Sequence, residues 1–288
     1  MAPQVAAIVV DNASSDSTAD CVCHRPGLLL IANSENRGFA AGLNQGVHEG
    51  GDSDFILILN PDAQLLTPLD ELVEATERHG VAAGRLVDES GRTQAGFTIR
   101  RFPTPAALVF ELFGVNRLWP ANPVNRRYRY LDRDLSQAGP ADQPAGAFLM
   151  VRRDVWKQLG GFDEQFFPVW FEDVDFCRRA VTAGYQIAYV PGVAARHRGG
   201  HSVHQIPVGL RASYWCASLL RYAAKHFGPW TFRGICAAVV LSSFPRMVAG
   251  VIRERTLSSA VSYLKIMRFA GLCLVSPGRL RGTAVRAS

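Results

Sequence analysis

The sequence predicts an α/β fold with a Rossmann-like, mainly parallel sheet flanked by helices, followed by a basic helical extension. Short apolar runs rich in β-branched residues alternate with segments of helical character, and this alternation is typical of a doubly wound sheet. The composition shifts after residue 204 to apolar and basic residues. A chain of 288 residues can hold one large domain and an appendage. We therefore expect domains at 1–204 and 205–288.

The first third of the chain supplies three of the expected strands. Val5–Val10 and Leu28–Ala32 are short apolar runs, Phe39–His48 has helical character, and Asp54–Leu59 is the third strand. The first strand runs into Asp11 and a Ser/Asp cluster, and the third stops at an Asn-Pro-Asp turn. Ligands of such sheets gather beyond the carboxyl ends of the strands, so polar residues collect where a site is expected.

The remainder of the first domain continues the alternation after an interruption. Residues 91–144 are rich in Pro, Arg and Asn without a long period, and we interpret them as a surface insertion or acceptor-facing loop. The other expected elements follow in chain order: a helix at Thr67–His79 capped by Thr67 and stopped by Gly80, strands at Val81–Val87 and Ala145–Arg152, a helix from Asp154 to Gly160, a helix from the acidic run to Ala183, a strand at Tyr185–Val190 and a loop at Arg196–Ser202.

The charge of the chain is divided unevenly between its two parts. Residues 205–288 carry 12 Lys or Arg and one acid, Glu254, whereas the first 204 residues carry 19 bases and 24 acids. Leu257–Met267 has the pattern of an amphipathic basic helix, which favours either contact with an anionic membrane or a cap packed on the enzyme body. Pro245 and Arg246 interrupt the longest apolar stretch, so no clear membrane span is expected. We expect no nucleic-acid partner.

The six cysteines indicate neither a disulfide framework nor a zinc site. They contain no CxxC pair, and Cys21 and Cys23 are two residues apart, which is poor spacing for zinc. We expect a reducing, cytoplasmic setting.

The acidic run Glu172, Asp173 and Asp175 is the strongest candidate for chemistry. Acids at the start of a helix are favoured by its dipole, so the cluster has a purely structural interpretation as well. Aromatic residues precede it, in the sequence FPVWFEDVDFCRR. A carboxylate among such residues can have its pKa tuned for general base work.

Asp62, at the end of the third strand, is a candidate metal ligand. Departure of a diphosphate calls for a divalent cation, and carboxylate oxygens suit Mg²⁺ or Mn²⁺. His197 can add an imidazole, although a lone His in a loop is more often a surface residue.

Gly38, Gly42 and Gly46 share one helical face. This face permits close approach either of another segment or of a phosphate, and both interpretations stay open. The pattern is not a Walker or GxGxxG loop, so ATP hydrolysis and hydride transfer lose support.

As an ordered set, these motifs resemble bacterial family 2 glycosyltransferases of the GT-A fold, and most closely their rhamnosyltransferase-like group. The resemblance covers about residues 6–203 and rests on VVDNASSDST, NRGFAAGLNQG, LNPDA, GAFLMVRRDVW with GGFDEQFF, and FEDVDFCRR followed by HRGGHS. It implies an inverting sugar transferase that uses a dTDP- or UDP-sugar, with dTDP-rhamnose as the leading donor, and a lipid-linked or polysaccharide acceptor in cell-envelope glycan synthesis. It also implies a cytoplasmic enzyme, peripheral on the inner face of the cell membrane.

The resemblance also implies roles for individual residues. Asp173 is expected as the general base, with Glu172 as second choice, while Asp175 holds the helix or a loop in place. The remaining expected roles are contact with the donor base by Asp11, a nucleotide pocket lined by Asn36, Gly38 and Asn44, a metal held by Asp62 and His197, and stabilisation of the leaving diphosphate by Arg178 or Arg179.

Two departures from the family pattern bear on these expectations. Asn60 stands where many relatives have a first Asp, as is usual in this subgroup, which leaves fewer carboxylates for the cation. Relatives also begin with a further strand and helix, so we expect an exposed strand edge and an incomplete nucleotide pocket. The alternative hypotheses are a truncated, non-catalytic, membrane-associated remnant and, less favoured, a metal-dependent phosphohydrolase.

Overall fold

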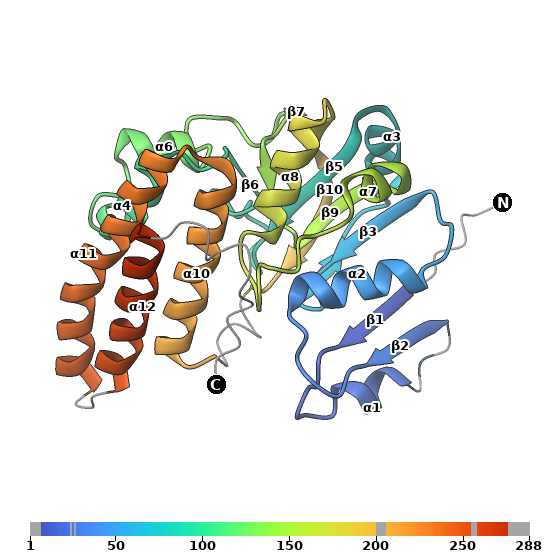
Figure 1. Cartoon of the computed structure of the whole chain (residues 1–288). Coiled ribbons are helices and arrows are strands. Elements are labelled where there is room, and N and C mark those ends of the chain that lie inside the picture. The colour runs from blue at the N-terminus through green and yellow to red at the C-terminus, as the bar shows by residue number, and fades with distance from the viewer. Residues whose placement is uncertain (1–6, 24, 26, 200–205, 255–257, 276–288) are drawn as a thin grey trace.

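The computed structural model describes residues 7–23, 25, 27–199, 206–254 and 258–275, arranged in three parts (Figure 1). A central sheet with its covering helices lies between a small β1–β2 unit on one side and three long C-terminal helices on the other. The α/β class and the helical extension are confirmed.

The central sheet is mixed. Its strands lie in the order β3 (Phe55–Leu59), β9 (Phe148–Arg152), β5 (Gly80–Val87), β10 (Gln186–His197) and β4 (Ala63–Leu65), with β7 (Gly139–Pro140) paired to β10. β5 and β10 are parallel, and β9 runs antiparallel to both of its neighbours, β3 and β5. β3, β5 and β10 therefore point the same way, with β9 reversed between them, so the sheet is less parallel than the sequence predicts.

β1 (Ala7–Asp11) and β2 (Leu28–Ala32) form a separate parallel pair beside α1 (Thr18–Cys23). Among the described residues β1 pairs only with β2, and β3 pairs only with β9. Val5 and Ala6, part of the expected first strand, lie outside the described residues. The helix α2 (Phe39–Glu49) lies in front of β1 and β3 in Figure 1 and connects the two sheets.

The helices that cover the sheet are α3 (Asp70–His79), α7 (Arg153–Leu159) and α8 (Glu172–Thr182). The structure corrects the expected cap at Thr67: α3 begins at Asp70, and the Thr67 hydroxyl accepts a hydrogen bond from Ala194 N at 2.9 Å. Leu72 of α3 is fully buried against one face of the sheet, and Phe176 of α8 is fully buried in the apolar cluster that includes Val151 of β9.

Residues 91–144 contain short elements that the lack of a long period concealed. They are β6 (Ile99–Arg100), paired with β8 (Gln143–Pro144), and the helices α4 (Pro105–Leu112), α5 (Val115–Leu118) and α6 (Pro123–Tyr128). α4 and α6 each begin with a capping residue followed by Pro: Thr104 accepts from Ala107 N, and Asn122 accepts from Asn125 N. This cap-and-proline pair is a typical helix start.

The extension consists of α10 (Val208–His226), α11 (Pro229–Glu254) and α12 (Ser258–Val275). Phe171, next to the acidic run, belongs to the same buried cluster as Leu220 of α10 and Val239 of α11, so the extension packs directly on the segment that carries the acids. Whether 1–204 and 205–288 are independent domains stays a prediction.

α11 differs from the sequence expectation because it continues through Pro245 without a break. Pro229–Ile252 is long and apolar enough to cross a membrane by length and composition, with 33% of its most apolar window buried inside the protein. Leu257, the expected start of the amphipathic helix, lies outside the described residues, and α12 begins at Ser258.

Candidate active site

Asp173, in the first turn of α8, is held by two backbone amides. Gly146 N donates to its Oδ2 at 2.9 Å, and Val174 N donates to its Oδ1 at 2.8 Å. Burial raises the pKa of Asp173, while these amides and the positive charge of Arg100 lower it, with a net shift upward. The two amides fix the orientation of the carboxylate, and the residue is not fully buried.

Glu172 sits in a more enclosed environment than its neighbour. Its side chain is buried, and its Oε2 has no hydrogen-bond partner among the described residues. Burial, together with the nearby charge of Asp173, holds the pKa of Glu172 well above its usual range. Burial thus disfavours the ionised form of Glu172 more strongly than that of Asp173, which favours Asp173 over the second choice, Glu172, as the base.

Asp175 is fully buried and forms ion pairs with three basic side chains. Arg179 Nε donates to it at 2.7 Å, His226 Nε2 at 2.7 Å and Lys225 Nζ at 3.0 Å. Burial acts to raise the pKa of Asp175, but the His226 hydrogen bond and the charges of Arg179 and Lys225 lower it to about 2. Because Lys225 and His226 belong to α10, Asp175 ties α8 to the extension, as the expected holding role requires.

The contacts of Arg178 and Arg179 bear on their expected role on the leaving diphosphate. Arg179 also donates to Leu159 O at 2.6 Å and to Gly161 O at 2.7 Å. Arg178 donates to Tyr222 Oη at 3.0 Å and lies over the ring of Phe102 at 5.6 Å. These contacts join α8 to its neighbours and give no support to the expected role, which stays a prediction.

The backbone just before the acidic run is strained. Trp170 and Phe171 have φ angles of +80° and +72°, in the left-handed region that bulky side chains rarely adopt. Two such residues in succession persist only where surrounding contacts hold them, and strain of this kind gathers at functional sites. The burial of Phe171 in the cluster shared with the extension provides that hold.

Asp62 and His197 lie next to each other near the ends of β3 and β10. Asp62 follows β3, His197 ends β10, and their Oδ1 and Nε2 atoms are 3.4 Å apart. Gly199 N donates to Asp62 Oδ2 at 3.1 Å. The expected loop from Arg196 thus begins after His197, and Gly200–Ser202 lie outside the described residues.

The environment of His197 suits a metal ligand better than a surface residue. The ring is buried, Phe97 stacks on it at 5.2 Å, and its Nδ1 lies 3.1 Å from Gln94 Oε1. Burial lowers its pKa despite the charge of Asp62, which favours neutral imidazole. Nε2 is buried without a hydrogen-bond partner among the described residues, and it faces a carboxylate.

This pair fits a divalent cation whose other ligands come from substrate and water. No group of three or more Cys, His, Asp or Glu side chains among the described residues could hold a metal alone. Mg²⁺ characteristically binds through one or two carboxylates together with substrate phosphates. Asp62 and His197 agree with that pattern.

The glycine face of α2 is packed against protein. A Cβ at Gly42 would meet Asn12 Nδ2 at 2.9 Å, and one at Gly46 would meet Val10 at 3.1 Å. Gly38, at φ +86°, lies against Phe167 and Pro168. Close packing, one of the two interpretations left open, accounts for all three glycines and brings the start of α2 beside the aromatic segment.

The remaining predicted nucleotide residues have clear local contacts. Asp11, at the end of β1, is buried and accepts from Ser14 N at 3.3 Å. Asn36 Oδ1 accepts from Gly38 N at 2.9 Å, which shapes the turn into α2. Asn44 donates to Phe162 O at 2.8 Å and accepts from Phe162 N at 3.0 Å. The side-chain amide of Asn44 is thus hydrogen-bonded to the backbone of Phe162. These contacts give no support to a place for Asn44 in the nucleotide pocket.

Several residues of the site had no predicted role. Gly146, Arg100 and Phe97 border the two candidate centres, and Asn12 donates to Gly38 O at 3.0 Å while accepting from Asn33 at 2.9 Å. Asn12 and Gly146 lie inside motifs that carry the family resemblance, which is a usable signal. Arg100 and Phe97 lie in the stretch without periodicity and gave none.

The helix-flanked mixed sheet, with Asp62 after β3 and Asp173 at the start of α8, fits the GT-A fold. Residues 2–207 match the family model described as glycosyltransferase like family 2, so the chain belongs to this family and is a glycosyltransferase.

Two curated relatives are similar over most of the chain. The N-acetylglucosaminyl-diphospho-decaprenol L-rhamnosyltransferase of Mycobacterium tuberculosis is 28% identical over 254 residues, covering 81% of each chain. The rhamnosyltransferase WbbL of Escherichia coli K12 is 26% identical over 205 residues, covering 67% of this chain and 73% of the relative.

Among solved structures, GalNAc-T7 with UDP, GalNAc and Mn²⁺ is similar at a TM-score of 0.51 and 12% identity, covering 76% of this chain. The match spans 41% of that structure's chain, and it supports the fold alone.

Proposed function

We propose that this glycosyltransferase transfers rhamnose, with inversion, from a dTDP- or UDP-sugar to a lipid-linked or polysaccharide acceptor in cell-envelope glycan synthesis. The observation that carries the proposal is the carboxylate of Asp173, which two backbone amides hold at the start of α8, together with the Asp62–His197 pair at the ends of β3 and β10. The names of the two curated relatives support rhamnose, and one of them names a diphosphate-linked lipid acceptor.

The proposed reaction uses Asp173 as a general base. Asp173 takes the proton of the acceptor hydroxyl as the oxygen attacks the anomeric carbon from the face opposite the diphosphate, so no covalent enzyme intermediate forms. Burial disfavours the ionised form of Glu172, so the negative charge is expected on Asp173. Asp62 and His197 would hold a Mg²⁺ or Mn²⁺ ion, which would supply charge neutralisation for the departing diphosphate.

The test is a transfer assay with purified protein and Mn²⁺. Labelled dTDP-rhamnose and UDP-glucose are offered with a prenyl-diphospho-N-acetylglucosamine acceptor, and we expect label in the lipid product from dTDP-rhamnose. Release of phosphate from the nucleotide sugar at the same rate with and without acceptor would instead support the phosphohydrolase hypothesis. No binding of either nucleotide would support the non-catalytic remnant.

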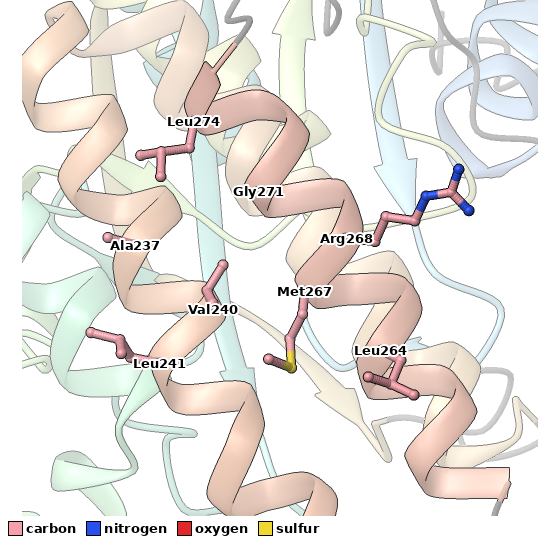
Figure 2. A pocket seen from close by; sticks show the side chains of 8 residues that line it. All are labelled: Ala237, Val240, Leu241, Leu264, Met267, Arg268, Gly271 and Leu274. Atoms are coloured by element: carbon pink, nitrogen blue, oxygen red, sulfur yellow. The ribbon is translucent and has the colours of Figure 1, made fainter.

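We also propose that α11 and α12 contact an anionic membrane surface. One side of each helix packs inward, while Leu241 and Leu264 are more than half exposed and border an apolar groove of about 560 Å³ (Figure 2). Arg268 lies at the edge of this groove. An apolar surface with basic residues at its rim suits an interface with anionic lipid.

Liposome flotation tests the membrane proposal. We expect wild type to float with vesicles containing phosphatidylglycerol and to float less with purely zwitterionic vesicles. Leu241→Glu together with Leu264→Glu should abolish flotation, while Val181→Glu, an exposed control on α8, should not. Failure of the wild-type protein to float with the anionic vesicles would contradict the proposal.

A further inference from the structure

Arg100 lies on β6, whose partner strand β8 leads directly to Gly146, the residue whose amide holds the candidate base Asp173. β6 and β8 pair antiparallel with Arg100 opposite Gln143. Three residues beyond Gln143, Gly146 donates its N–H to Asp173 at 2.9 Å. The positive charge of Arg100 is close enough to act on the Asp173 carboxylate. The pairing therefore fixes this arginine beside the reacting end of α8.

Two aromatic rings and one carbonyl hold the Arg100 guanidinium in place. Its central carbon lies 5.8 Å from the ring centre of Phe97 and 5.9 Å from that of Tyr128, and its Nε donates to Gly96 O at 2.6 Å. Phe97 also stacks on His197, so a single ring separates Arg100 from the candidate metal pair. Such stacking leaves the terminal guanidinium nitrogens free to form hydrogen bonds.

Arg100 differs from its arginine neighbours in having no carboxylate partner. Arg101 pairs with Asp132 at 2.9 Å, and Arg129 pairs with Glu111 at 3.5 Å. Among the described ranges, no ion pair includes Arg100, and no acceptor bonds its terminal nitrogens. A fixed, half-buried guanidinium with unused donors beside a carboxylate is suited to an incoming anion, and phosphate oxygens match its geometry.

We propose that Arg100 binds a phosphate oxygen of a substrate diphosphate beside Asp173. This inference rests on the proposed function for the identity of the substrates. Both donor and acceptor can supply that oxygen, because a nucleotide sugar and a prenyl-diphospho sugar carry the same group. Arg100 acts on Asp173 and shares the ring of Phe97 with His197, so it is near both candidate centres and can bind a diphosphate at either.

The test is calorimetric binding with the full chain in the presence of Mn²⁺. The probes are dTDP for the donor, farnesyl-diphospho-N-acetylglucosamine for the acceptor, and octyl N-acetylglucosaminide as an acceptor without phosphate. Arg100→Gln should weaken one of the phosphorylated probes by about tenfold or more, in line with a charge-assisted hydrogen bond. Loss of dTDP affinity assigns the donor, and loss of affinity for the farnesyl compound assigns the acceptor.

Matched variants separate binding from folding. Arg101→Gln removes a neighbouring arginine that already has a carboxylate partner and should change each affinity less than twofold, and Arg100→Lys should recover part of the lost affinity. If Arg100→Gln binds both phosphorylated probes within twofold of wild type, or if wild type binds neither, the proposal is wrong. The readout is binding, so failure of rhamnose transfer alone contradicts the proposed function and leaves this result standing.

Discussion

The central sheet and the β1–β2 unit are stabilised in different ways. In the central sheet, β5 and β9 are almost wholly buried. No apolar residue of β1 or β2 among the described residues is buried, and that unit is joined to α2 through amide contacts such as Asn12 to Gly38. The difference indicates that the candidate carboxylates lie beside a well-buried core, while the proposed nucleotide side is less buried and is held in part by polar contacts.

The largest expected effect concerns the metal pair on the central sheet. Asp62→Ala should lower transfer by about a hundredfold or more, because a cation at a departing diphosphate contributes several kcal/mol. The measurement is the initial rate across a Mn²⁺ titration. Gln64→Ala, a change on the adjacent strand β4, is the control, and an unchanged Mn²⁺ dependence in Asp62→Ala would remove this residue from the site.

The next largest effect is a loss of folding stability on breaking the Asp175 contacts between α8 and α10. Asp175→Asn should destabilise the protein by about 3–5 kcal/mol, because it leaves buried basic groups without their carboxylate. Its folded pKa of about 2 lies below the ordinary 3.8. The stabilisation from Asp175 is thus complete above pH 3.8 and is lost as pH falls toward 2. Urea denaturation at pH 7 measures the effect, and Asp163→Asn, which removes a less buried partner of Lys225, should cost less.

A smaller effect is expected in the β1–β2 unit. Asn12→Ala should cost about 1–2 kcal/mol locally, because it removes two partly buried hydrogen bonds. Hydrogen exchange should be faster in β1 than in β9 for wild type, faster still in β1 of the variant, and slowed in β1 by dTDP with Mn²⁺. Equal protection of β1 and β9 would show that the two regions are equally stable.

The smallest expected effect is on the pH dependence of kcat/KM for transfer. The pKa of Asp173 is raised above 3.8, and a base works only when deprotonated. The acid limb of kcat/KM should therefore fall at a pH above 3.8. Glu172→Gln removes the neighbouring carboxyl and should leave that limb in place, whereas loss of the limb would make Glu172 the titrating base.

The sequence predicted most of the fold and part of the site. Strands such as Leu28–Ala32 were found because buried strands are short apolar runs. The helices of residues 91–144 were missed because each is too short to show a period. Asp173 and Asp62 stood out by chemistry at element ends, but Arg100 depends on pairing between β6 and β8, and such distant pairing has no local signal. The partners of Arg178 and Arg179 could not be foreseen, because spacing along a helix does not reveal which residues lie across it, and their role on the diphosphate stays a prediction.

Asp173→Asn tests the central claim most directly. The variant removes the base but keeps the shape of the side chain, so we predict that transfer falls by about a hundredfold to ten-thousandfold. Its affinity for dTDP with Mn²⁺ should stay within threefold of wild type, because Asp62 and His197 are untouched. Near-normal transfer by Asp173→Asn, with nucleotide binding intact, would contradict the assignment of Asp173 as the catalytic base.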